Sequence, residues 1–360
     1  MSSDPSSWAN KAHHDHSTID PAFHRNRVRS LIFLAILAVV LVLTILLSLR
    51  AGSYETPISE LIRGIFGRAH DENINRVVRN NRLPRICTAI IAGAGLGISG
   101  CVLQAILRNP LASASTLGVS QGASFGAAFA IVVLNAGAAG AAGSAVIPLC
   151  AFAGSMAVAL VILGLSRFRQ ISPEGIVLAG VAISSMFTGA TTLIQYFADE
   201  IELASLVFWT FGNLGSTTWS DLRIMGIVVL VTSICFLLHR WDYNALLSGT
   251  ETAVSLGINV RRLTLVDMVL CCLTASIIVS YIGLINFIGL VAPHLARRLV
   301  GGNYCVLLPA SALTGAALLV LGDLAARQIL SPVVLPIGAI TSFLGAPLFL
   351  YLLFKGGKRL

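Results

Sequence analysis

The sequence lacks the short motifs that would give this chain a nucleotide-binding or metal-dependent hydrolytic site. A phosphate-binding loop needs Gly-x-x-x-x-Gly-Lys followed by Ser or Thr, and the late candidate at residues 356–359 reads Gly-Gly-Lys-Arg, without the hydroxyl residue. No His-Glu-x-x-His pair for zinc is present either. We therefore predict that the chain is not an enzyme, holds no cofactor of its own and does not bind ATP through a P-loop.

Two acidic residues fall inside apolar stretches, Asp267 near the start of one and Asp323 near the end of another. A carrier driven by a proton or sodium gradient needs buried ionisable groups near the middle of the membrane. Both carboxylates could instead lie at helix ends or pair with nearby arginines. Their small number argues against a stand-alone ion-coupled secondary transporter, which stays open as the alternative function.

Cysteine and histidine give no firm metal site. The seven cysteines are scattered, mostly within apolar stretches, and none has Cys-x-x-Cys spacing, so they are typical of small core residues. His13, His14 and His16 cluster near the N-terminus. A metal site is conceivable there, but the polar composition favours a disordered tail over residues 1–29.

Membrane-spanning helices must position these residues. The chain is 56% hydrophobic and 11% charged, with a mean hydropathy of +0.85, whereas soluble domains carry roughly 25% charged residues. The pattern predicts an all-α integral membrane protein with about ten spans in a polytopic domain over residues 30–356. We place the spans at 31–49, 86–107, 111–135, 144–166, 172–198, 220–239, 262–283, 284–300, 305–325 and 333–354, and the pair at 262–300 could be one long element.

The distribution of Lys and Arg predicts the orientation, because cytoplasmic loops are enriched in these residues. With both termini (residues 1–29 and 357–360) in the cytoplasm, fifteen of the 24 basic residues lie inside and nine outside. Six of those nine fall between Arg63 and Arg85, in a first outer loop at 50–84 and directly after it. Docking of an acidic partner would explain this excess, although a loop of this length can also escape the charge rule.

Several segments between or within the spans have distinct compositions. Residues 58–66 form an amphipathic piece of the outer loop, and Asn109-Pro110 predicts a sharp turn between two spans. Gly93, Gly97 and Cys101 are spaced four apart, which lets another helix backbone approach closely. The glycine- and hydroxyl-rich run at 116–126 is expected to meet protein or a cavity rather than lipid.

A polar insert at 241–261 predicts one short amphipathic helix that ends at Gly257. Such a helix can lie on lipid, but its short length and small basic charge favour a helix offered to a cytosolic partner.

Motifs along nearly the whole chain resemble the FecCD-type family of ABC transporter permeases, which import cobalamin, haem and ferric siderophores. The matching residues are Arg82-Leu-Pro-Arg85, Ser99-Gly100, Gln104, Asn109-Pro-Leu-Ala112, Leu117-Gly118, Leu178-Ala-Gly-Val-Ala182, Trp209 with Gly212, Ala253-x-x-Leu-Gly257, Phe287-Ile-Gly-Leu-Val-Ala-Pro-His-Leu-Ala-Arg297, Leu308-Pro309-Ala310, Asp323-Leu-Ala-Ala-Arg327, Leu335-Pro-Ile-Gly338 and Gly345-Ala-Pro347.

The resemblance implies a type II ABC importer permease with ten helices. It also implies a second permease chain, two cytosolic subunits that bind ATP and Mg, and an extracytoplasmic substrate-binding protein. No nucleic-acid partner is implied. The expected location is the cell (inner) membrane.

The resemblance also implies roles for individual residues. Docking of the binding protein is implied for Arg82, Arg85 and Arg327, and the inner gate for Asn109, Leu111 and Ser172. Coupling to the ATPase is implied for Leu246, Leu247, Thr250, Ala253, Leu256 and Gly257. Trp209 and Gly212 are expected to line the translocation path or its entrance.

The expected mechanism is alternating access at a two-fold interface between permease chains. The substrate stays open among ferric siderophore, haem and cobalamin, with iron chelates first. A homodimer and a pair of similar permeases are equally compatible with the sequence.

Overall fold

The computed structural model describes residues 21–51, 57–137, 140–169 and 172–356, and no strand occurs in these ranges. The predicted N-terminal tail with its histidine cluster lies outside the described residues, as does the tail at 357–360. The helices are α1 Pro21–Arg50, α2 Ile58–Ile65, α3 Glu72–Arg76, η3 Val77–Arg82, α4 Leu83–Ile106, α5 Val119–Ala128, η4 Phe129–Val133, α6 Gly140–Arg169, α7 Pro173–Phe197, α8 Glu200–Thr210, α9 Trp219–Leu238, α10 Arg240–Leu247, α11 Thr250–Ser255, α12 Val260–Ile282, α13 Ile288–Val300, α14 Tyr304–Gln328 and α15 Ile337–Gly356.

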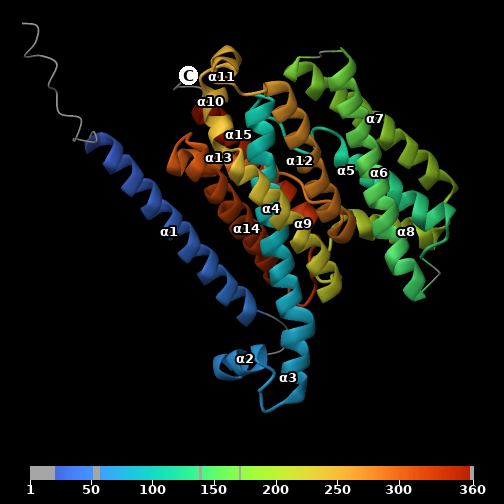
Figure 1. Cartoon of the computed structure of the whole chain (residues 1–360). Helices are drawn as coiled ribbons and strands as arrows, with labels where there is room; N and C mark the ends of the chain where they lie inside the picture. Colours follow the sequence, from blue (N-terminus) through green and yellow to red (C-terminus); the bar gives the residue numbers. More distant parts are fainter. Residues whose placement is uncertain (1–20, 52–56, 138–139, 170–171, 357–360) are drawn as a thin grey trace, which may run out of the picture.

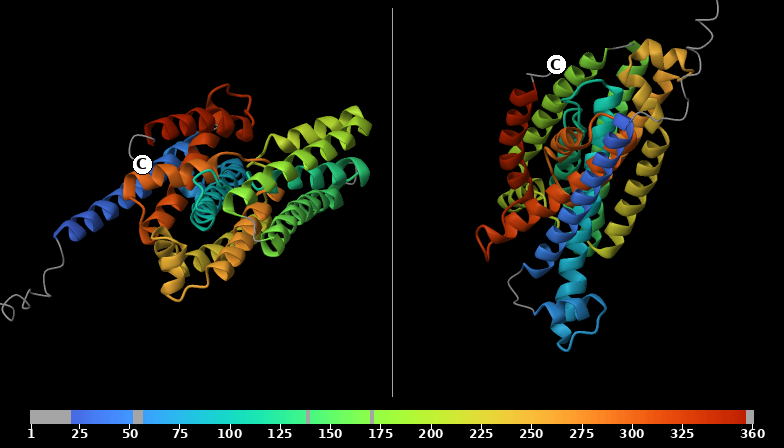
Figure 2. Two further views of the ribbon diagram at one scale, coloured as in Figure 1. Left: turned by 90° about the horizontal axis from the view of Figure 1, so that it is seen from above. Right: turned by 90° about the vertical axis from the view of Figure 1, so that its left-hand side faces the viewer.

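The helices form a bundle with two distinct ends (Figure 1). Helices α2 and α3 project from one end, and α10 and α11 cap the other. Helix α1 lies along one edge, α5 to α8 lie on the opposite side, and α4 and α14 run between them, as the view from above also shows (Figure 2). We refer below to the α2–α3 end and the α10–α11 end.

Seven described helices are long and apolar enough to cross a membrane: the helical stretches at 28–50, 72–106, 145–167, 174–197, 219–238, 260–282 and 304–328. Two shorter apolar helices, Val119–Val133 and Ile337–Leu352, match two further predicted spans. The predicted span at 284–300 is α13, which has 13 residues and carries Arg297 and Arg298 in its last turn. The chain is therefore a multi-pass helical membrane protein, and the count of ten spans stays a prediction.

The chain between 262 and 300 forms two helices rather than one. Helix α12 ends just before Gly283, whose φ of +74° favours glycine, and α13 begins after Phe287, whose φ of +65° is uncommon for a bulky residue. A Cβ on Gly345 of α15 would lie 2.5 Å from the Phe287 Cβ, so this break is enclosed by α15. The stretch therefore holds two helices rather than one long element.

Helices α4 and α14 form the central packed pair. A Cβ on Gly93 would lie 2.4 Å from the Gly315 carbonyl oxygen, and one on Gly97 would lie 2.3 Å from that of Ser311. The small-residue face predicted on α4 is therefore confirmed as a helix-packing face, and α14 is its partner. The glycine-rich run at 116–126 likewise meets protein, because Gly122 and Gly126 face the α6 backbone.

Candidate functional site

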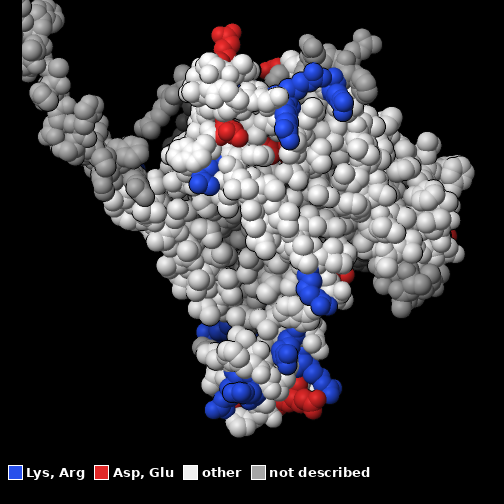
Figure 3. Space-filling model, in the orientation of Figure 1, with Lys and Arg blue, Asp and Glu red and all other residues white. Residues whose placement is uncertain are grey.

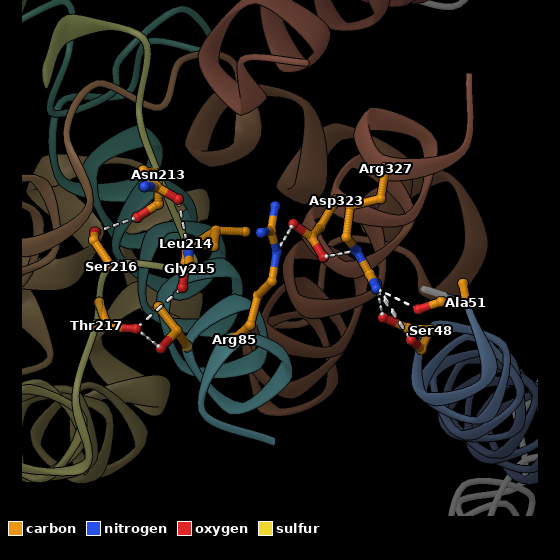
Figure 4. Close-up of polar contacts among 11 residues, drawn as sticks. Ser48, Ala51, Arg85, Asn213, Leu214, Gly215, Ser216, Thr217, Asp323 and Arg327 are labelled. Carbon is orange, nitrogen blue, oxygen red and sulfur yellow. Dashed lines mark hydrogen bonds and ion pairs between the residues drawn. The ribbon is translucent and has the colours of Figure 1, made fainter. Parts of the chain in front are cut away.

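At the α2–α3 end, two arginines share one buried carboxylate (Figure 4). Arg85 of α4 donates from Nε to Asp323 Oδ1 at 2.8 Å, and Arg327 donates from Nε to Asp323 Oδ2 at 3.0 Å. The Asp323 side chain is 1% exposed, so its charge depends on these two partners. Arg327 lies one turn after Asp323 on α14, which places both on the same helix face.

The same end holds α1 by its last carbonyl groups. Arg327 donates to the backbone oxygens of Ser48 and Ala51 at 3.3 and 2.8 Å, and it also contacts the Ser48 hydroxyl. Arg82 donates to the Leu49 oxygen at 2.8 Å. Since the last carbonyls of a helix have no partner within it, these arginines satisfy the C-terminal end of α1.

The three arginines predicted to dock a binding protein are thus in internal contacts in this structure. Arg82 is 6% exposed, and the side chains of Arg85 and Arg327 are 17% and 11% exposed. These contacts do not test the docking role, which therefore stays a prediction. Four exposed arginines lie further out on the projecting segment: Arg63, Arg68, Arg76 and Arg79. Figure 3 shows the basic patches around α2 and α3.

The loop between α8 and α9 lies beside Arg85 (Figure 4). Thr217 shares a hydrogen bond of 2.7 Å with Thr88 of α4, and the Asn213 N–H donates to the Ile282 oxygen at 2.8 Å. Gly212 has a φ of +74°, and the Gly338 N–H donates to the Phe211 oxygen at 2.9 Å. Trp209 and Gly212, predicted at the entrance, therefore lie where α8, the end of α12 and the start of α15 meet.

The residues predicted for the inner gate lie toward the opposite end of the bundle. Asn109 accepts a hydrogen bond from the Leu111 N–H at 2.8 Å, which shapes the predicted turn after α4. Leu111 is 43% exposed and lines a groove along α7 with Ser115, Val181 and Ser185. Ser172 is the N-cap of α7, because its hydroxyl accepts from the Gly175 N–H at 3.2 Å.

Sequence reasoning gave no role to His294, which also holds this turn. His294 Nε2 lies 2.9 Å from the Pro110 oxygen, so α13 and the turn after α4 are joined. The sequence signal was its place within the motif at 287–297.

The predicted coupling segment consists of two short helices rather than one. The break falls at Gly249, whose φ of +111° ends the helical path between α10 and α11. The coupling residues then divide by exposure: Leu246 and Ala253 are buried, Thr250 is half-buried, and Leu247, Leu256 and Gly257 are exposed. Gly257 has a φ of +84°, as a glycine ending of α11 requires.

A buried polar cluster connects α10 to the bundle. Asp267 of α12 accepts from the Tyr243 hydroxyl at 2.8 Å, and its other oxygen lies 2.9 Å from His239 Nδ1. Burial raises the pKa of Tyr243 far above its usual value and Asp267 raises it further, so the hydroxyl stays protonated and donates. The sequence singles out Asp267 but not its partners: His239 lies at the junction of α9 and α10, and Tyr243 lies in α10.

Comparison with known proteins finds a family and several relatives that match nearly the whole chain. The family model described as the FecCD transport family matches residues 40–355. A protein of Methanocaldococcus jannaschii that is named as an ABC transporter permease is 47% identical over 92% of this chain and 96% of its own length. The Fe(3+)-citrate import permease of Bacillus subtilis and the hemin transport permease of Yersinia pestis are each 34% identical, over 93% and 91% of this chain and 98% and 97% of their own lengths.

A solved structure has the same fold. It is described as a metal-chelate type ABC transporter in an inward-facing conformation and is 32% identical, with a TM-score of 0.77 over 90% of this chain and 99% of that one. The helix arrangement described above is thus that of a known transporter permease.

Proposed function

The chain belongs to the FecCD transport family, and from this membership we propose that it is the permease subunit of an ATP-driven importer of a metal chelate. The observation that carries the proposal is the match of residues 40–355 to one permease family. A ferric chelate, such as a siderophore, is the first candidate substrate, because relatives are named for iron citrate and hemin. Haem and cobalamin are the other candidates.

The paired state of both intramembrane carboxylates supports this proposal over a stand-alone ion-coupled carrier. Asp323 is shared by Arg85 and Arg327, and Asp267 is bonded to Tyr243 and His239. A carboxylate that cycles a proton or sodium ion must exchange its partners during transport. Because both oxygens of each carboxylate already have side-chain partners, a structural role suits Asp267 and Asp323 better than a role in ion transport.

In the proposed mechanism, the α10–α11 end faces the cytoplasm and contacts the ATPase, of which the complex holds two subunits that bind ATP and Mg. The exposed apolar side chains of Leu247, Val254 and Leu256 offer a contact surface there. The α2–α3 end faces the binding protein. A second permease chain, identical or similar, completes the translocation path, and closure of the ATPases switches the two chains between outward- and inward-open states.

Reconstitution tests the proposed function. The chain is placed in proteoliposomes with its ATPase and a binding protein loaded with an iron-55 siderophore, and uptake is followed with and without ATP. We expect uptake that requires ATP and the binding protein. Uptake by the purified chain alone under a proton or sodium gradient would refute the proposal.

Docking is tested with two sets of variants. Arg68→Glu with Arg79→Glu reverses exposed charge on the projecting segment, whereas Arg85→Gln removes the charge beside Asp323. We expect both to weaken capture of the binding protein in a pull-down while the ATPase still co-purifies, because the partner surface is proposed to be acidic. Full capture by both variants would exclude this surface.

A further inference from the structure

Helix α10 is too short to hold its own orientation. It has eight residues, and helices of this length are unstable in isolation, so its position depends on contacts with the rest of the bundle. It lies between α9 and α11 in the chain and contacts α9, α4 and α14 in space. Whatever fixes α10 therefore fixes the start of the segment proposed to meet the ATPase.

A further contact, with α12, is centred on Asp267. Its side chain is fully buried in α12, and each of its two oxygens has one partner at the α10 end, Tyr243 on Oδ2 and His239 on Oδ1. His239 is the residue at which α9 ends and α10 begins. A buried carboxylate is costly unless it is hydrogen-bonded, so this arrangement strongly favours one placement of α10 against α12.

A second polar contact joins α10 to α14. Asn244 accepts from the Tyr304 N–H at 2.8 Å and donates to Asn303 Oδ1 at 3.0 Å, at the first turn of α14. The rings of Tyr243 and Tyr304 also meet edge to face, with centroids 5.6 Å apart. By contrast, α11 is held chiefly by buried Ala253, and its Val254 and neighbouring Leu256 are exposed.

We propose that Asp267 is a positioning residue for energy coupling: through Tyr243 and His239 it fixes α10 rigidly to α9 and α12, so that movement of the α10–α11 end moves the membrane helices. This inference rests on the proposed function, because it assigns the route by which ATPase closure reaches the bundle. Asp267 touches no substrate in this role and transfers no proton.

The test compares uptake with ATP hydrolysis in the reconstituted complex. Tyr243→Phe removes only the donor hydroxyl, and Asp267→Asn keeps the side-chain volume. We expect the ratio of substrate imported to ATP hydrolysed to fall roughly tenfold in each, the scale of a lost hydrogen bond to a charged group. The double variant should be no worse than Asp267→Asn alone, because the Tyr243 hydroxyl acts only through the Asp267 carboxylate.

The matched control is Thr232→Val. Thr232 and Thr274 share a buried hydrogen bond of 2.9 Å between α9 and α12, the same two helices, without touching α10. A general loosening of the bundle would affect this control equally, and it would lower uptake and hydrolysis together. An unchanged ratio in Tyr243→Phe and Asp267→Asn, or an equal loss in Thr232→Val, would overturn the inference.

Hydrogen exchange on the purified permease separates this inference from the proposed function. Amides of α10 should exchange faster in Tyr243→Phe than in the wild-type chain, whether or not the complex assembles. Unchanged exchange in α10 would refute the positioning role even if import is ATP-driven. Absence of ATP-driven uptake by the wild-type complex would refute the proposed function instead.

Discussion

Single residues at the α2–α3 end combine charge pairing with helix capping. Asp323 binds two arginines, and one of these, Arg327, also binds carbonyl groups of α1. An arginine fork can make these contacts together because its five donors lie in one plane. The group thus joins α1, α4 and α14 around one carboxylate.

Asp323→Asn should destabilise the folded chain. The substitution leaves Arg85 and Arg327 largely buried without a full counter-charge, and breaking a buried ion pair costs about 3 kcal/mol or more. We expect a lower midpoint of thermal unfolding in detergent. Glu72→Gln, which breaks an exposed pair with Arg76, is the control and should change stability by less than about 1 kcal/mol. Equal midpoints for the two variants would contradict this assignment.

Arg327→Lys should loosen the end of α1 specifically. Lysine keeps the positive charge but cannot reach Asp323, Ser48 and Ala51 with one planar fork. We expect faster hydrogen exchange at residues 47–51, with exchange in α12 unchanged. Exchange that stays slow at 47–51 would show that Arg82 alone is sufficient to hold α1.

At the scale of helices, close backbone approach determines how α4 and α14 pack. In membranes, such packing replaces much of the hydrophobic driving force that acts between helices in water. The two helices therefore tolerate little added volume where their glycines meet.

Gly315→Ala should weaken the packing of α4 against α14. The new Cβ would lie 2.2 Å from the Gly93 oxygen, so the helices must separate, at a cost of about 1–3 kcal/mol. The control is Gly164→Ala in α6, because no described atom lies within 4 Å of a Cβ there. The control should be neutral or slightly stabilising, and thermal unfolding of both variants measures the difference. If Gly164→Ala lowered the stability while Gly315→Ala left it unchanged, the close packing of α4 against α14 at Gly315 would be contradicted.

At the scale of the whole molecule, two exposed helix faces differ in chemistry. The exposed face of α1 is apolar, as at Val39 and Leu43, which are 56% and 54% exposed. The exposed face of α7 mixes hydroxyl groups, such as Ser185 and Thr188, with apolar residues. We infer that α1 meets lipid, whereas α7 borders the proposed path between two permease chains.

Cysteine labelling distinguishes these faces. In a background without reactive native cysteines, Ser185→Cys and Thr188→Cys should react with a water-soluble maleimide in proteoliposomes of the complex. Val39→Cys and Leu43→Cys should not, because lipid excludes the reagent and keeps the thiol protonated. Equal reactivity at both faces would exclude the proposed path along α7.

The sequence by itself determined the helical membrane class, the positions of most spans and the family. These follow from local properties: long apolar runs need lipid, and motifs such as those at 82–85 and 287–297 can be recognised without coordinates. The turn at Asn109 and the glycine face of α4 were also predictable, because backbone restriction and residue size act locally.

Only the tertiary structure decided which partners the charged residues have. Asp323 and Arg85 are 238 positions apart, and Asp267 is 28 positions from His239, so no local pattern links them. The same holds for two of the arginines predicted to dock a partner, Arg82 and Arg327, which bind the end of α1. Burial and pairing depend on which helices lie side by side, and that arrangement depends on packing across the whole bundle.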